Sequence, residues 1–175
     1  MRLIVTDANI IIDLAAGDLL DTMFRLPRVE FYVPDVLYEE ELAERHGSLP
    51  RLGLKIASQP AEAVAEVEQL RQRYRRASVN DLFALVLARR LGCALLSGDR
   101  ALREAAELER IEVRGTLWLI DALLQAHLLT IDRAEAAYEA MRRDGSRLPW
   151  DEVRAQVGRW RAGSGEYDAR LGASR

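Results

Sequence analysis

Short apolar runs alternate with longer amphipathic segments along the first two thirds of the chain. Each short run is rich in aliphatic residues, and in the segment that follows it the apolar positions recur every three or four residues. Strands that alternate with helices in this way form βαβ units, in which the strands pair in parallel. The pattern therefore predicts an α/β fold. We expect strands over residues 3–6, 30–33, 93–97 and 111–114 and helices over residues 10–16, 36–45, 61–76, 80–91, 100–107 and 117–127.

The pattern changes at two places. Residues 47–60 combine glycine, proline and serine without periodicity, which predicts a connecting loop. Beyond residue 130 the sequence predicts two amphipathic helices, over residues 131–141 and 151–160, and the small polar residues from position 163 onward are expected to be flexible. The predicted organisation is an α/β domain over residues 1–130 and a helical appendage with a flexible tail over residues 131–175.

Composition narrows the class of protein. With 175 residues, of which 49% are hydrophobic, the chain can bury a core of its own. Its uncharged apolar stretches are far shorter than the roughly 20 residues that a membrane-spanning helix needs, and the first apolar run meets Asp7 too early for a secretory signal, so we expect a cytoplasmic protein without a membrane partner. Because Cys93 is the only cysteine, a thiolate cluster is excluded and oxygen atoms must hold any metal.

Four acidic residues lie at the ends of successive apolar runs: Asp7, Glu40, Asp81 and Asp99. Asp7 ends the first predicted strand and Asp99 follows the third, and open α/β sheets bind ligands at the carboxyl ends of their strands. Mg²⁺ and Mn²⁺ prefer carboxylate and water oxygens, so converging acids without histidine or cysteine suit these ions. Such ions orient and activate water for attack on phosphorus. The four acids therefore predict a Mg²⁺ or Mn²⁺ site that handles phosphate groups.

Each acid also has a purely structural explanation. Asp7 is a good cap for the helix that follows it, and Asp81 would complete a capping box at the start of its own helix. Glu40 belongs to the acidic run 39–41, and such a run is usually a solvated helix face. Asp99 follows a glycine and suits a turn. The four acids in combination favour a metal site more than any single one of them does.

Polar and basic residues beside these acids extend the predicted site. Thr6, Asn9 and Ser97 are candidates for groups that orient the carboxylates, although Asn9 is equally suited to cap the first helix. The formal net charge of −3 argues against a protein that coats nucleic acids, but local basic patches still bind phosphates. Arginines near the acids could hold a polyanionic backbone, while the helix dipole alone also explains those that end the helix over residues 61–76. The candidate arginines are Arg75, Arg76, Arg100 and Arg103.

Four motifs occur in the order known from PIN-domain proteins. The segment IVTDAN over residues 4–9, followed by IIIDL over residues 10–14, resembles the opening motif of that family, and PDVLYEE over residues 34–40 resembles its acid-bearing helix after the second strand. The segment NDLFALVLA over residues 80–88 is similar to the central acidic helix, and LLSGD over residues 95–99 is similar to the strand end that supplies a further aspartate. The resemblance extends to about residue 125.

The resemblance implies a three-layer α/β/α fold with a central, mostly parallel sheet and a metal-dependent endoribonuclease that hydrolyses RNA phosphodiester bonds. Such proteins are most often the toxins of bacterial toxin-antitoxin pairs (VapC-like), are dimeric, and are inhibited by a small antitoxin protein. The resemblance also implies that Asp7, Glu40, Asp81 and Asp99 are catalytic and bind one or two Mg²⁺ or Mn²⁺ ions, with Glu39 as the alternative to Glu40. Some members carry another acid shortly after the position of Asp99, where this chain continues with Arg100, so the number of ions stays open.

Two other classes of function are compatible with parts of the sequence. A PIN-like interaction module without nuclease activity would use the helices of residues 131–160. A phosphoacceptor receiver domain also gathers carboxylates at strand ends, but it places a lysine near the phosphoryl group, and the only lysine, Lys55, lies in the predicted loop. The nuclease is therefore the function we expect, with the interaction module as the alternative. The residues that could form an apolar face for such a module are Trp118, Leu148, Trp150 and Trp160.

Overall fold

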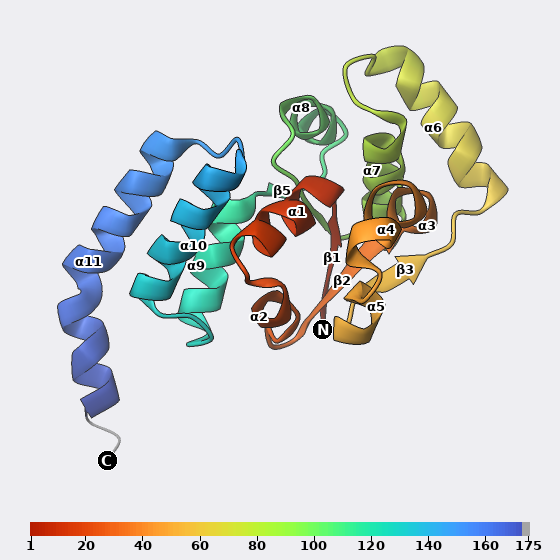
Figure 1. The fold of residues 1–175 in the computed structure, drawn as a ribbon. Helices are drawn as coiled ribbons and strands as arrows, with labels where there is room; N and C mark the ends of the chain where they lie inside the picture. Colours follow the sequence, from red (N-terminus) through yellow and green to blue (C-terminus); the bar gives the residue numbers. More distant parts are fainter. Residues whose placement is uncertain (173–175) are drawn as a thin grey trace.

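Five parallel strands form the central sheet of the computed structural model, which describes the backbone of residues 1–172 and the side chains of residues 1–163 (Figure 1). The strand order is β3-β2-β1-β4-β5, and every neighbouring pair is parallel. This arrangement confirms the predicted α/β class and its parallel sheet. The strands are β1 (Arg2–Thr6), β2 (Val29–Pro34), β3 (Lys55–Ala57), β4 (Ala94–Leu96) and β5 (Val113–Arg114).

Helices cover both faces of this sheet. α7 packs against β1, β2 and β4 and in turn contacts α6 and α8, whereas α1 lies on the other side of β1 with α2, α9 and α10 (Figure 1). The predicted three-layer α/β/α arrangement is therefore confirmed. The helices of these two layers are α1 (Ala8–Ala16), α2 (Leu20–Phe24), α6 (Ala61–Arg73), α7 (Val79–Leu91), α8 (Arg100–Leu108), α9 (Thr116–Gln125) and α10 (Ile131–Asp144).

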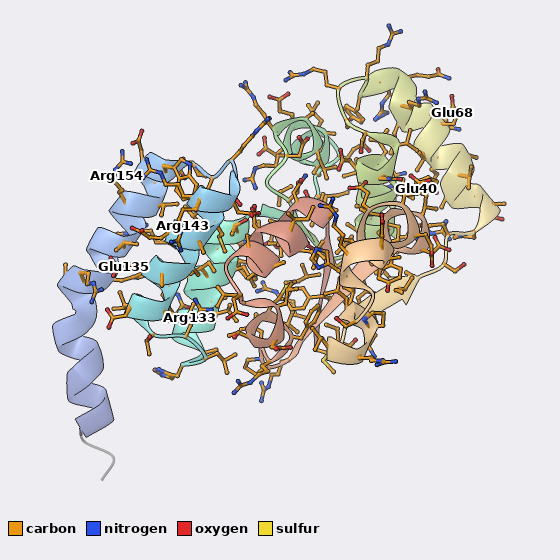
Figure 2. The ribbon with its side chains drawn as sticks, viewed as in Figure 1. Glu40, Glu68, Arg133, Glu135, Arg143 and Arg154 are labelled. Atoms are coloured by element: carbon orange, nitrogen blue, oxygen red, sulfur yellow. The ribbon has the colours of Figure 1, made fainter. Side chains whose placement is uncertain are left out.

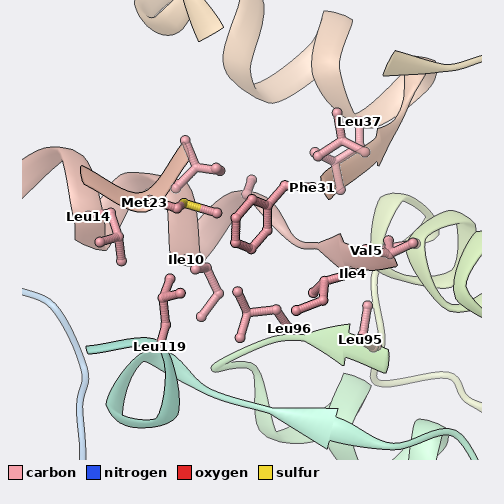
Figure 3. Packing of buried hydrophobic residues seen from close by; sticks show 14 of the residues in the cluster. Ile4, Val5, Ile10, Leu14, Met23, Phe31, Leu37, Leu95, Leu96 and Leu119 are labelled. Carbon is pink, nitrogen blue, oxygen red and sulfur yellow. The ribbon is translucent and has the colours of Figure 1, made fainter. Parts of the chain in front are cut away.

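The hydrophobic core follows from the short apolar runs. Strands of parallel sheets are covered on both faces and consist largely of aliphatic residues, and Ile4 and Leu96 are accordingly at most 1% exposed. Figure 3 shows Phe31 of β2 and Leu96 of β4 gathered with Ile10 of α1 in this core. The same core holds the apolar face of α7, from Leu82 to Ala88.

The register between β1 and β4 determines which residues meet at the carboxyl edge of the sheet. Thr6 is paired with Leu96, and the Asp7 N–H donates to the Leu96 carbonyl at 3.0 Å. The chain proceeds outward from β1 to β3 on one side of the sheet and from β4 to β5 on the other. The boundary between β1 and β4 is thus the topological switch point, where open α/β sheets form a crevice for ligands.

The prediction of a loop over residues 47–60 is wrong. This stretch contains the one-turn helix α5 (Leu49–Leu52) and the edge strand β3, which pairs in parallel with β2. β3 has only three residues, and Ile56 at its centre is 40% exposed. A strand this short, which buries little apolar surface, leaves no hydrophobic alternation in the sequence. The helix α2 was not predicted either.

The helix predicted over residues 36–45 is irregular. It begins as α3 (Asp35–Leu37), continues as the π-helical segment η1 (Tyr38–Leu42) and ends as α4 (Ala43–His46). A π-helical turn accommodates an extra residue within a helix and often marks a functional position. The segment η1 carries the acidic run 39–41.

The two C-terminal helices pack on the α/β layers. The buried residues of α10 belong to the same core as the sheet, and a Cβ atom added to Gly17 of α1 would lie 2.7 Å from Met141 Cε and 3.2 Å from Ala137 Cβ of α10. α11 (Trp150–Gly172) runs beside α10 (Figure 1). The segment that was expected to be flexible from residue 163 is thus helical as far as Gly172, and residues 173–175 lie outside the described part. The division of the chain at residue 130 stays a prediction.

A buried polar contact fixes α11 to the rest of the molecule. Gln156 is 6% exposed; its Oε1 accepts a hydrogen bond from the Tyr138 hydroxyl at 2.6 Å and its Nε2 donates to the Leu117 carbonyl at 2.9 Å. Trp160 stacks on Tyr138 with ring centroids 6.2 Å apart, and its Nε1 donates a hydrogen bond to Asp121 at 2.9 Å.

Within the described residues, no helix is long and apolar enough to cross a membrane.

Replacing Gln156 by leucine is expected to destabilise the protein, because the buried Tyr138 hydroxyl then loses its acceptor. Burial raises the pKa of Tyr138, so this hydroxyl stays a neutral donor at all physiological pH values. The expected loss in free energy of unfolding is about 1–3 kcal/mol, measured by urea denaturation. The double variant Tyr138→Phe/Gln156→Leu should recover part of this loss, because neither partner is then left unsatisfied. Additive effects of the two single changes would contradict this prediction.

Candidate acidic site at the carboxyl edge of the sheet

Asp7 lies at the centre of the candidate site, at the switch point between β1 and β4. It caps α1, with Oδ1 accepting a hydrogen bond from the Ile10 N–H at 3.0 Å. Oδ2 accepts a hydrogen bond from the Ser97 hydroxyl, and the side chain is fully buried. Both carboxylate oxygens are therefore held in place by the ends of β1 and β4.

The electrostatic environment of Asp7 disfavours its negative charge. Burial raises the pKa of Asp7 to about 7, and the charges of Asp81 and Asp13 act in the same direction, while the hydrogen bonds from Ser97 and Ile10 partly offset this increase. Within the described residues, the charges that shift this pKa are all negative. A positive charge placed beside Asp7 would favour the ionised carboxylate strongly, because little water screens it.

Ser97 joins Asp7 to the next acid. Its hydroxyl donates to Asp7 and accepts a hydrogen bond from the Asp99 N–H at 3.0 Å, and the side chain is fully buried. Asp99 caps α8 through Oδ1, which accepts from the Leu102 N–H at 2.8 Å. The serine after β4 thus positions the two acids that follow the central strands.

Asp81 approaches from the start of α7. Its carboxylate accepts a hydrogen bond from the Ser78 N–H at 3.0 Å, and its own N–H donates to the Ser78 hydroxyl at 3.0 Å, which is the expected capping box. Burial raises the pKa of Asp81, and the charge of Asp99 raises it further. Because the charge of Asp81 also raises the pKa of Asp7, the three aspartates form one electrostatic group. The structure therefore brings Asp7, Asp81 and Asp99 together while all three also serve as caps.

Glu40 is held at the edge of this group. It is exposed in η1, and its Oε2 accepts a hydrogen bond from Asn80 Nδ2 at 3.0 Å. The same Nδ2 donates to Glu41 Oε1 at 2.7 Å, whereas Glu39 makes no hydrogen bond among the described side chains. Asn80 precedes Asp81, so this contact ties Glu40 to the start of α7. Beyond the acidic run itself, no pattern in the sequence marks Asn80 or Glu41 as members of the site. Figure 2 labels Glu40.

The three residues expected to orient the carboxylates differ in their contacts. Ser97 binds the Asp7 carboxylate, as described. The Thr6 hydroxyl instead donates to the Asp7 backbone carbonyl at 3.1 Å, because neighbouring side chains of a strand point to opposite faces. Asn9 is exposed in the first turn of α1 and makes no hydrogen bond to the acids in the described part of the chain. Asp7 occupies the cap position that Asn9 was equally suited to fill.

Asp13 is a further acid of this edge, to which the sequence analysis assigns no role although it lies in the opening motif. It lies on α1, and its Oδ2 accepts a hydrogen bond from the Thr116 hydroxyl at the start of α9 at 3.2 Å. Burial raises its pKa, hydrogen bonding from the Ser146 side chain lowers it, and the charge of Asp144 raises it. The only sequence signal was a single acid within an otherwise apolar stretch of α1. Its contacts lie more than 100 residues away along the chain.

Arginines border the acids on the α8 side. Arg103 Nη1 donates to the Ser97 carbonyl at 3.0 Å. Arg76 and Arg100 both pair with Glu104, at 3.5 and 2.8 Å. Arg75 is exposed and forms no ion pair with any described residue. Arg76, Arg100 and Arg103 thus lie around the start of α8, next to Asp99.

The donor set suits a hard divalent cation in its chemistry. The side chains that the structure places around Asp7 offer carboxylate and hydroxyl oxygens, and Mg²⁺ and Mn²⁺ bind such oxygens. In the described part of the chain no three acidic, histidine or cysteine side chains are close enough to hold one ion together. Mg²⁺ commonly uses one or two carboxylates and completes its shell with water and substrate phosphate. The residues present therefore fit an ion that water and substrate help to hold.

Comparison with known proteins adds independent information. A family model described as "PIN domain" matches residues 3–161, and the match extends through α10 into α11. Among solved structures, a PilT N-terminus domain protein from the hyperthermophilic archaeon Sulfolobus solfataricus is similar at 13% sequence identity, with a TM-score of 0.49 over 70% of this chain and 94% of that chain. No curated protein matches the sequence.

Replacing Asp7 by asparagine is expected to stabilise the metal-free protein at alkaline pH. The folded-state pKa of about 7 exceeds the ordinary value of 3.8, so the stability that protonated Asp7 contributes is present at low pH and is lost as the pH rises through 7. Asparagine still caps the helix and does not ionise. The advantage of Asp7→Asn over wild type in free energy of unfolding should grow by about 2–3 kcal/mol between pH 5 and pH 8, measured by urea denaturation in EDTA. An advantage that does not change with pH would show that burial of the carboxylate costs nothing.

Proposed function

The chain belongs to the PIN-domain family, whose members are generally nucleases, and we propose that it is a metal-dependent endoribonuclease that hydrolyses RNA phosphodiester bonds. The observation that carries this proposal is Asp7: a fully buried carboxylate at the switch point of the sheet, whose described electrostatic partners are other acids. Such an arrangement costs folding free energy, and a site that binds cations explains why it is kept.

One or two of the carboxylates of Asp7, Asp81 and Asp99 would hold a Mg²⁺ or Mn²⁺ ion together with water and substrate phosphate, with Glu40 at the edge of the group. A bound divalent ion supplies positive charge that favours ionisation of water and stabilises negative charge developing on the phosphate. Ser97 and the Ile10 N–H hold the Asp7 carboxylate in one orientation, so it need not be ordered when substrate binds. Within the described residues, Oδ1 of Asp81 and Oδ2 of Asp99 accept no hydrogen bond and are available to water or an ion. Arg75 and Arg103 would contact the phosphates of the substrate.

The interaction module has less support. The side chains that could form its apolar face have contacts within the chain: Leu148 is buried and Trp160 stacks on Tyr138. The guanidinium groups of Arg2 and Arg114 lie 5.9 and 5.5 Å from the centroid of the Trp118 ring. Arg142 covers the ring of Trp150. The three tryptophans thus already have partners within the fold, which leaves less of their surface for a second protein.

RNA cleavage by the purified protein tests the proposed chemistry. End-labelled RNAs should be cut in Mn²⁺ or Mg²⁺ and left intact in EDTA, and Asp81→Asn should lower the rate by at least ~100-fold, because it removes a charged ligand from the acidic group. Asp21→Asn, which removes an exposed aspartate from α2, is the matched control and should cut at the wild-type rate. Equal rates for wild type and Asp81→Asn would refute the assignment of the site.

We also propose that the protein is a toxin of the VapC-like kind, dimeric and inhibited by a small antitoxin; the support is the resemblance of its four motifs to those proteins. Induced expression in a bacterial host should then arrest growth, and expression of Asp81→Asn to the same level should not. Growth arrest by both proteins would show that the toxicity does not depend on the acidic site. Growth unaffected by either would count against the toxin assignment.

A further inference from the structure

The loop between α10 and α11 lies beside the acidic site. Asp13 of α1 accepts a hydrogen bond from the Thr116 hydroxyl, at the start of α9, at 3.2 Å, and the Ser146 side chain of the loop also lies beside the Asp13 carboxylate. Gly115, the residue before Thr116, lies beside Ser97 and Arg103, since a Cβ atom added to it would be 3.7 Å from the Ser97 carbonyl oxygen and 3.5 Å from Arg103 Nη1. The α10-α11 loop, residues 145–149, therefore reaches the same edge of the sheet as β1, β4 and α8.

The packing of α10 fixes this loop in position. At the start of α10, Arg133 Nη2 donates to the backbone carbonyls of Gly17 and Asp18 at 3.0 and 2.8 Å and pairs with the Asp18 carboxylate. Along α10, Met141 lies where a side chain on Gly17 would be. At its end, Gly145 adopts a left-handed conformation with φ +92°, and Leu148 is buried. A loop anchored at both ends can present its side chains in a defined geometry.

Two arginines flank this loop without a counter-charge. Arg143, in the last turn of α10, and Arg147 are exposed, and in the described part of the chain no carboxylate lies within ion-pair distance of either. Arg142, their neighbour, lies instead 5.7 Å from the ring centroid of Trp150. The segment from 142 to 147 holds three arginines and one acid, Asp144, so it carries an excess of positive charge. On the α8 side, by contrast, Arg76 and Arg100 share Glu104.

The acidic site thus has unpaired arginines on both sides. Arg75 follows α6 on one side, and Arg143 and Arg147 lie on the other. In Figure 2, Arg143 and Glu40 are on opposite sides of α1. A strand that crosses the acids meets repulsion from their carboxylates, and guanidinium groups on both sides offset it by binding phosphates.

We propose that the α10-α11 loop forms one wall of the substrate site and that Arg143 and Arg147 bind phosphates of single-stranded RNA beside the scissile bond. This proposal rests on the proposed ribonuclease function. It makes the two C-terminal helices part of substrate binding, with the loop held against Asp13 as the link to the acidic site.

The test compares two double variants of the full chain that carry the same change in net charge. Arg143→Gln/Arg147→Gln removes both guanidinium groups of the loop. The control, Arg25→Gln/Arg159→Gln, removes two exposed arginines that form no ion pair with described residues. Arg25 lies between α2 and β2, and Arg159 lies in α11. Binding of a fluorescent single-stranded RNA is measured by anisotropy in EDTA over a range of salt concentrations. The loop variant should bind about 5-fold to 20-fold more weakly than wild type, and its slope of log K against log salt should fall by about 1.4, since each phosphate contact contributes about 0.7. The control variant should match wild type in both.

Each other outcome has a definite meaning. Equal affinities and salt slopes for the loop variant and wild type, or no RNA binding by wild type, would overturn the proposal. Equal losses in both double variants would also overturn it, because net charge alone would then explain the effect. If only the loop variant loses binding but wild type cuts no RNA in Mn²⁺ or Mg²⁺, the loop assignment stands as an RNA contact and the proposed nuclease function fails. Thermal unfolding confirms that all variants are folded.

Discussion

The hydrogen bond from the Ser97 hydroxyl to the buried Asp7 carboxylate is the contact on which the organisation of the site depends. It joins the residues after β1 and β4, the two strands at the switch point, and its geometry requires the parallel register that pairs Thr6 with Leu96. The same Ser97 hydroxyl accepts a hydrogen bond from the Asp99 N–H, so one hydroxyl group fixes the positions of two acids relative to each other. A slip of one residue in this register would turn Ser97 to the other face of the sheet and leave Asp7 buried without a donor on Oδ2.

Structural and functional explanations of the acids are compatible in this molecule. Asp7 and Asp99 cap helices, and Asp81 completes a capping box, as the sequence alone indicates. Because caps lie at helix N-termini, and these helices start at the carboxyl edge of a parallel sheet, capping itself brings the three side chains to one place. The cost of that convergence appears in the raised pKa values of Asp7 and Asp81. Capping alone would not require Asp7 to be fully buried beside other acids.

The sequence predicted the parts of the structure that rest on local pattern. β1, β4 and α7 bury continuous apolar runs, and Asp7, Asp81 and Asp99 follow from their ends. It did not predict β3, which buries little, or the π-helical segment η1, whose extra residue leaves the acidic run 39–41 without a clear periodicity. Nor did it indicate Asp13 and Asn80, because their importance comes from contacts with Thr116 and with Glu40, which are distant along the chain. Local periodicity finds the ends of elements, while pairing across elements depends on the assembled fold.

The C-terminal helices show why a domain boundary predicted from the pattern of the sequence can differ from one defined by the packing of the helices. After residue 130 the strand-helix alternation stops, which suggests an appendage. Yet α10 packs so closely on Gly17 that a Cβ atom there would displace the Met141 methyl group, and Gln156 of α11 is hydrogen-bonded to both Tyr138 and Leu117. The match to the family model continues to residue 161. Because α1 carries both Asp7 at its start and Gly17 at its end, the surface that α10 covers belongs to the same helix that the acidic site uses. Displacing α10 would therefore expose the apolar side of α1 and also free Asp13 from its contact with the α10-α11 loop.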